Sequence, residues 1–327
     1  MRLAALVVLL FSAGAPPASA ADNGAWKGAA AYLNYAPSAR SVAMGQADSA
    51  APSDASAVWS NPAGLSLLAS PSVATASGLL GLDRSLYFVG VAYPMSFKYQ
   101  SFNSSFSVRE VFPIAIAAGL TNYGVGGIDG RDDFGGRQSS FQDVERSLYV
   151  SMGMRPTDWL AMGMTWKRLT QNLANASAEG TAYDAGFLLI SPEKYWGQCN
   201  LSFVSKDIGG SLNWKVPDDL LGARFDYEER VESKLVIGGS YATPGKRWRL
   251  SLDAVQAQHQ QLAFHVGSEF VLYPGLRLRT GMNAYDPTFG IGIDHAIGRV
   301  KLALDYAFQY SLDSLHSPNW VGLNLFF

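Results

Sequence analysis

A two-residue alternation of apolar and polar side chains recurs through residues 72–327, and it constrains the fold more than any other feature. Between Val300 and Tyr310 the even positions are all apolar or aromatic, whereas the odd positions include Lys301 and Asp305. Because successive side chains of a β-strand point to opposite faces, this pattern predicts a strand with one apolar and one polar face. A half-buried strand of a soluble protein has the same pattern, so length and repetition must decide between the two.

Segments of this kind recur at the length of a membrane-spanning strand, which is about 9 to 11 residues. An even number of strands brings both ends of a barrel to the same side of a membrane. The sequence therefore predicts an all-β fold, a 14-stranded antiparallel transmembrane β-barrel. The expected strands lie near residues 72–79, 85–94, 112–122, 145–154, 160–170, 182–191, 198–206, 234–242, 248–256, 262–272, 277–285, 288–296, 300–310 and 320–327.

The composition indicates a surface that meets something other than water. Charged residues make up 16% of the chain and hydrophobic residues 48%, whereas about a quarter of an ordinary globular chain is charged. After residue 20, no apolar run reaches the roughly 20 residues of a membrane helix. The chain is therefore either a membrane barrel or a soluble protein such as a ligand-binding periplasmic sandwich. The net charge of -2 lacks the basic excess of nucleic-acid binders, so we expect no nucleic-acid partner.

The two ends of the predicted barrel differ in the length of their connections. Turns after even strands are mostly short and include Trp159 and Trp196, which suit an aromatic girdle at a membrane surface. Long loops at residues 123–144 and 207–233 follow odd strands, and long loops face the outside. The connection at residues 95–111 is too long for a periplasmic turn, which leaves a hairpin extension or a miscounted strand.

Both chain ends carry targeting features. Residues 1–20 combine Arg2, an apolar core and a small-residue cleavage pattern ending at Ala20, and they predict a cleaved signal peptide. The last predicted strand alternates and closes on Phe327, as in the signal that the barrel assembly machinery recognises. We expect a protein of the outer membrane of a diderm bacterium, in contact with outer-membrane lipid and, during insertion, with that machinery.

Residues 21–70 have no strand pattern and are predicted to be a hatch that plugs the lumen of the barrel at residues 71–327. Eight strands make a barrel filled by its own side chains and sixteen leave an aqueous channel, so a lumen between these sizes needs an occupant. Ser38 is expected to cap a helix at residues 39–47, and Ser53 or Asp54 a turn through Trp59. Gly64 permits a left-handed residue after the Asn-Pro pair.

Two interpretations of the Asn-Pro segment remain open. It is either a tight turn that fixes the hatch, or part of an apolar pocket of Val58, Trp59, Ala63 and Leu65 whose movement opens a path for a hydrophobic ligand. The candidate hatch, gating or ligand residues are Arg40, Met44, Gly45, Val58, Trp59, Asn61, Pro62, Ala63, Gly64 and Leu65.

The polar faces of the predicted strands carry ionisable side chains of both signs, which excludes a single-sign ion filter. We expect these groups to pair across the wall or to hold the hatch backbone, and direct substrate contact is the alternative. His265 is expected to form hydrogen bonds in the lumen beside Glu269. The four histidines lack metal-ligand spacing and no catalytic motif is present, so we expect no enzyme activity, metal or cofactor. The predicted lumen residues are Lys167, Asp184, Arg249, Asp253, His265, Glu269, Arg277, Arg279, Asp294, Lys301 and Asp305.

Residues 38–65 also resemble the N-terminal signature of the PorV/PorQ family of outer-membrane proteins, which is related to the FadL-type long-chain fatty-acid transporters. The resemblance implies a 14-stranded barrel with an inward hatch, and two kinds of function. One is accessory duty in type IX secretion, with secretion components or exported proteins as partners. The other is passage of hydrophobic small molecules through an apolar lumen pocket and a lateral gap in the wall. The long loops and the signature favour the first. The matching positions are Ala39, Arg40, Met44, Gly45, Ala47, Asp54, Ala55, Ala57, Asn61, Pro62, Ala63, Gly64 and Leu65.

Overall fold

The computed structural model describes residues 29–100, 109–131, 134–137, 139–218, 223–258, 260–312 and 316–327. The predicted signal peptide, with its cleavage near Ala20, and the first residues of the predicted hatch lie outside these ranges. No helix in the described ranges is long and apolar enough to cross a membrane.

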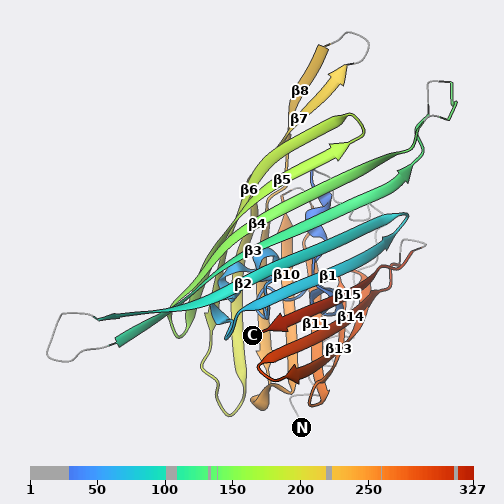
Figure 1. The fold of residues 1–327 in the computed structure, drawn as a ribbon. Coiled ribbons are helices and arrows are strands. Elements are labelled where there is room, and N and C mark those ends of the chain that lie inside the picture. The colour runs from blue at the N-terminus through green and yellow to red at the C-terminus, as the bar shows by residue number, and fades with distance from the viewer. Residues whose placement is uncertain are drawn as a thin grey trace.

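One antiparallel sheet closes on itself through the pairing of β6 with β7 (Figure 1). Strand β8 pairs only with β7, as a hairpin that extends β7 beyond the wall, so fourteen strands form the closed barrel. The predicted fold class is thereby confirmed. The strands are β1 (Ser72–Gly81), β2 (Arg84–Gln100), β3 (Arg109–Ile128), β4 (Phe141–Thr157), β5 (Leu160–Leu173), β6 (Ala176–Ile190), β7 (Gln198–Asp218), β8 (Ala223–Arg230), β9 (Lys234–Ala242), β10 (Trp248–Ala257), β11 (Ala263–Tyr273), β12 (Leu276–Asn283), β13 (Asp286–Ile297), β14 (Val300–Gln309) and β15 (Asn319–Phe326).

The segments expected to be long connections are largely strands. In the predicted connection at 95–111, the described residues 95–100 and 109–111 extend the β2–β3 hairpin, which stays paired to the register Gln100 with Arg109. The predicted loop at 207–233 contains the end of β7 and all of β8 within its described residues, and the loop at 123–144 is shortened by β3 and β4. A strand that stands in water needs no apolar outward face, so alternation gives no signal there.

The two faces of the wall match the predicted alternation. On β14, Leu304 and Tyr306 are 45% and 43% exposed on the outside, whereas Asp305 between them is 2% exposed. Trp159 and Tyr273 are exposed at the end of the barrel where the turns are short, the short-turn end. The opposite end, which carries the β3–β4 connection and β8, is called the long-loop end.

Residues 29–68, the inner segment, lie inside the barrel (Figure 1, blue). Their short helices touch opposite walls: α2 packs on β13 and β14, and η2 packs on β4 and β5. The predicted helix at residues 39–47 ends at Ala43, because Gly45 and Gln46 have positive φ. The helices are η1 (Ala31–Asn34), α2 (Ala39–Ala43), α3 (Ala57–Ser60) and η2 (Pro62–Leu67), with η3 (Pro244–Lys246) in the β9–β10 turn.

Candidate functional site: the lumen and its inner segment

Glycines on the inner face of the wall let the inner segment approach the strand backbone. A Cβ atom placed on Gly163 of β5 would lie 2.4 Å from the carbonyl carbon of Pro62. On the opposite wall, a Cβ on Gly281 of β12 would lie 2.4 Å from the nitrogen of Gly45. Because both neighbours are backbone atoms, no side chain can be accommodated at either position without movement. The inner segment is therefore fitted to the wall on both sides.

Asn61 connects the two halves of the inner segment. Its side-chain Nδ2 donates to the backbone carbonyl of Ser49 at 2.8 Å, and its side-chain Oδ1 accepts from the backbone N–H of Ala63 at 3.0 Å. Asn61 is extended, with φ -159° and ψ 107°, as the residue before a proline is expected to be. Gly64 is not left-handed, contrary to the prediction. A Cβ atom there would instead collide with the ring of Pro52.

A buried ionic cluster, the Arg40 cluster, ties α2 to the wall. Arg40 pairs with Glu269 of β11 at 3.3 Å and donates to the carbonyl of Ala51 at 3.2 Å. Glu269 also pairs with Arg279 at 2.8 Å and with Arg249 at 3.8 Å, and Arg279 reaches Asp305 at 2.6 Å. A buried charge is tolerated only when it is paired and hydrogen-bonded, so these contacts support one another.

A second buried cluster, the Lys167 cluster, joins β5, β6, β7 and β9. Lys167 pairs with Asp184 at 2.8 Å and with Asp207 at 2.7 Å, and Lys234 pairs with Asp207 at 3.1 Å. The structure thus pairs most of the predicted lumen charges with one another. Of the remaining predicted charges, Arg277 and Lys301 both pair with Asp294, while Asp253 forms no ion pair with a described residue.

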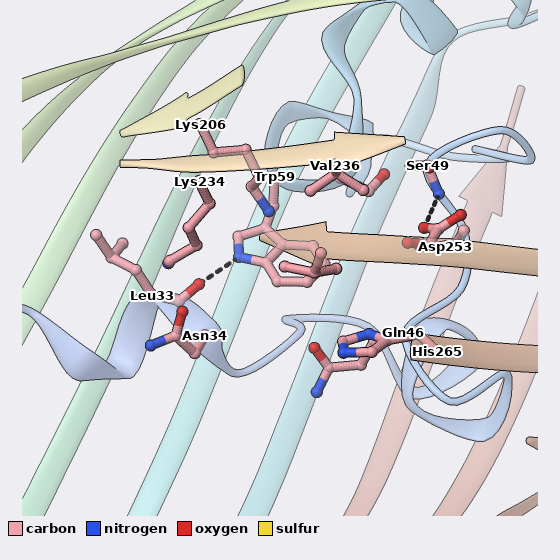
Figure 2. A pocket seen from close by; sticks show the side chains of 13 residues that line it. Leu33, Asn34, Gln46, Ser49, Trp59, Lys206, Lys234, Val236, Asp253 and His265 are labelled. Carbon is pink, nitrogen blue, oxygen red and sulfur yellow. Dashed lines mark hydrogen bonds between the residues drawn. The ribbon is translucent and has the colours of Figure 1, made fainter. Parts of the chain in front are cut away.

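A small cavity of about 40 Å³ separates the inner segment from β7, β9, β10 and β11 (Figure 2). Leu33, Val236 and Val255 give it an apolar side, and the Trp59 ring lines it as well, among the other side chains drawn in Figure 2. Polar side chains make up most of the remaining wall: Asn34, Gln46, Asp48, Ser49, Ser60, Lys206, Lys234, Asp253 and His265. Of the four residues predicted to form an apolar pocket, Trp59 lines this cavity, while Val58, Ala63 and Leu65 are packed in the core.

Several polar groups around the cavity have unused bonding capacity. Asp253 accepts from the Ser49 amide at 3.0 Å through one oxygen, and its other oxygen has no hydrogen-bond partner among the described residues. Lys206 places its ammonium 3.6 Å from the centre of the Trp59 ring, and Trp59 is held by a hydrogen bond to the Leu33 carbonyl at 3.0 Å. Burial raises the pKa of Asp48 to about 6, against the opposing effect of Arg40.

Sequence reasoning missed two inward residues of β7. Lys206 continues the alternation of the buried Ser202 and Val204, whereas Asp207, next to it, also points inward and breaks that alternation. Asp207 and Gly209 have positive φ, and β7 gains extra residues relative to β6 there: Tyr183 pairs with Ile208, but Ala185 pairs with Ser205. The doubled inward position is the signature of a β-bulge, and in the sequence it ends the regular alternation. Ordinary small polar residues were also missed, for example Ser202, which bonds Ser49, and Thr288, which bonds the Ala43 carbonyl.

No protein-family model and no curated protein matches this sequence. Solved structures of other proteins do match its structure. The Pseudomonas putida toluene transporter TodX has a TM-score of 0.51 at 14% identity, over 88% of this chain and 96% of that one. The chain has the fold of the FadL-type barrels. A FadL homologue from Pseudomonas aeruginosa matches with a TM-score of 0.50 at 10% identity, over 85% of this chain and 95% of that one. The monoaromatic hydrocarbon channel CymD matches with a TM-score of 0.50 at 10% identity, over 87% and 95%.

The FadL part of the predicted resemblance is thus supported, whereas these matches do not confirm the PorV/PorQ part. Within the described residues, no three His, Cys, Asp or Glu side chains come together as metal ligands. The lumen presents apolar surface, paired charges and a few polar groups that lack a partner among the described residues.

Proposed function

We propose that this protein is an outer-membrane channel for hydrophobic small molecules, and that its inner segment is a hatch that closes the lumen. The observation that carries the proposal is the inner segment itself. It lies in the lumen and continues into β1 at one end, and it is otherwise held to the wall by non-covalent contacts that can break and re-form, such as those of Asn61 with Phe187 and of Arg40 with Glu269. A plug built this way suits gating better than permanent blockage.

The outer face of the wall supports a place in the membrane. Its outward side chains are apolar over the length of a bilayer core, for example Val91, Ile116 and Val150 on neighbouring strands. An open apolar groove of about 750 Å³ also crosses this face, lined by residues including Met164, Trp166 and Tyr183. Apolar surface of this size would be an aggregation hazard in water. In lipid it faces acyl chains.

The seam between β6 and β7 is the place where we expect cargo to leave sideways into lipid. Regular pairing is lost between Tyr183 and Ala185, and the Asp207 amide bonds the Asp184 carboxylate instead of a strand carbonyl. Tyr183 lies at the outer groove, and Lys206, next to Asp207, lies at the inner cavity. The seam therefore separates the cavity from the groove by one strand pair whose backbone bonds are already incomplete.

The structural neighbours favour this function over secretion duty. They include proteins described as a toluene transporter and as a monoaromatic hydrocarbon channel, which share the fold of this chain. The long outer loops that favoured a protein partner are mostly strands, and β8 is a short hairpin arm rather than a separate outer domain.

The test is uptake by living cells. A host that lacks its general porins and its own hydrocarbon channels is given this chain or an empty vector, and the initial uptake of radiolabelled toluene is measured. We expect faster uptake in cells that carry the protein in their outer membrane. Equal uptake in the two strains, with the folded protein present in the outer membrane, would refute the channel. Crosslinked partners identified by mass spectrometry as secretion components would favour the other function.

A further inference from the structure

The ammonium of Lys206 is a buried charge that forms no salt bridge with any carboxylate of the described residues. Its nearest neighbours across the wall include Lys234, which is directly opposite it in the β7–β9 register. In the Lys167 cluster the two aspartates, Asp184 and Asp207, already pair with Lys167 and Lys234. The Lys206 ammonium makes a cation–π contact with the Trp59 ring, and no described side chain accepts a hydrogen bond from it.

A cation–π contact satisfies only part of such a group. The contact stabilises a desolvated ammonium by less than the free energy that its removal from water costs. The three N–H donors of the ammonium still need acceptors. The cavity beside it, at about 40 Å³, has room for a water or for one oxygen-bearing group, but not for a whole ligand.

We propose that Lys206, supported on Trp59, receives an uncharged oxygen acceptor of the transported molecule, and that the channel prefers hydrophobic alcohols and phenols to hydrocarbons of the same shape. The proposal rests on the function proposed above and names its substrate class. A hydrocarbon whose end reaches this cavity offers no acceptor to the ammonium. A hydroxyl oxygen at the same place accepts from Lys206.

The charges around the cavity explain why the acceptor is uncharged. Asp48 and Asp253 line the same space, and Asp253 has an oxygen without a partner among the described residues. A carboxylate on the ligand would bring a further negative charge beside these two. A hydroxyl group, by contrast, both accepts and donates, so it matches an ammonium on one side of the cavity and a carboxylate oxygen on the other.

The experiment compares three probes that differ at one position: 4-butyltoluene, 4-butylphenol and 4-butylbenzoate. Their initial uptake is measured in the porin-deficient host, and the rate of the empty-vector strain is subtracted. For the unaltered protein we expect the phenol to exceed both other probes by roughly tenfold or more, since sites built around a hydrogen bond reject analogues that lack it.

Variants then assign the preference to Lys206. Lys206→Met should bring the ratio of 4-butylphenol uptake to 4-butyltoluene uptake close to one. Lys206→Gln, which keeps a hydrogen-bond donor, should retain part of the preference for the phenol. Lys246→Met, in the exposed β9–β10 turn, is the matched control and should leave the ratio unchanged. Heat-modifiable migration on gels checks that each variant is folded.

The outcomes distinguish a failure of the proposed preference for phenols from a failure of the proposed channel function. Protein-dependent uptake with a ratio near one in the unaltered protein, or a ratio that Lys206→Met leaves unchanged, overturns the inference and leaves the channel standing. Faster uptake of the benzoate than of the phenol overturns it too, in favour of an anion site. Absence of protein-dependent uptake for all three probes refutes the channel itself.

Discussion

Gly163 is the position where a single methyl group should loosen the hatch. In Gly163→Ala the new Cβ would lie 2.4 Å from the Pro62 carbonyl carbon and 2.6 Å from the Ala63 nitrogen. Ordinary contact begins at 3.4 Å, so the turn that starts at Pro62 must retreat by about 1 Å. That retreat pulls on the Asn61 hydrogen bonds to Ser49 and Ala63.

The expected cost is that of overpacking a tight contact, about 1 to 3 kcal/mol. The strain is present only while the hatch is seated, because the Cβ atom meets no obstacle once Pro62 has moved. The substitution should therefore raise the ratio of displaced to seated hatch by roughly 5- to 150-fold. The barrel wall itself keeps all of its backbone pairing, since β5 bonds β4 and β6 through backbone atoms that an alanine also provides.

The assay is the entry of a chromogenic β-lactam into porin-deficient cells that contain a periplasmic β-lactamase. Gly163→Ala should increase the rate of hydrolysis in intact cells while heat-modifiable migration stays normal. Gly239→Ala on β9 is the matched control, because a Cβ atom there has no neighbour within 4 Å. If the two variants leak equally, or if neither differs from the unaltered protein, the close fit at Pro62 does not seal the lumen.

Three further predictions follow from the attachments of the hatch. Replacing Asn61 and Pro62 with Ala should leave barrel insertion intact but raise entry of the same β-lactam, and unchanged entry would count against a seal at this turn. Glu269→Gln leaves buried Arg40 without its carboxylate and should cost about 3 kcal/mol or more, seen as a lower temperature of heat modification. The matched exposed-pair change Glu179→Gln should cost about 1 kcal/mol or less, and equal shifts would contradict this. Burial raises the pKa of Asp48 to about 6, so the folded state favours its protonated form. The stability that this group contributes is fully present below its ordinary pKa near 4 and is lost as pH rises through 6. Asp48→Asn should remove this loss between pH 4 and pH 7, and parallel pH profiles of the two proteins would disprove it.

The barrel could be predicted from sequence because membrane lipid imposes one rule on every strand. Outward residues such as Leu304 must be apolar, while Asp305 faces the lumen, so each spanning strand carries the same readable period. Outside the lipid, outward residues need not be apolar. No two-residue alternation therefore marked β8 or the ends of β2, β3 and β7 in the sequence. Charged lumen residues were also predictable, because an ionisable side chain on the polar face has no place except the interior.

The contacts between hatch and wall could not be predicted in the same way. The chain contains 33 glycines, and no sequence pattern shows that Gly163 meets Pro62 or that Gly281 meets Gly45, because each pair is far apart in the chain. Asp207 was hidden for a related reason. It lies at a bulge, where one added residue reverses the expected face of everything that follows until the register recovers, whereas Lys206 just before it continues the regular inward positions of Ser202 and Val204.

The most direct test of the account is to fix the hatch to the wall. A Cβ atom on Gly322 of β15 would lie 3.2 Å from that of Ala39 in α2, near the roughly 3.5 to 4.5 Å that a disulfide spans. Ala39→Cys with Gly322→Cys, in a chain whose single Cys199 is changed to Ser, gives a reversible lock. We predict that toluene uptake falls to the empty-vector rate when the lock is oxidised and returns on reduction. Uptake that continues at full rate through the locked, correctly folded protein would contradict a channel gated by this segment.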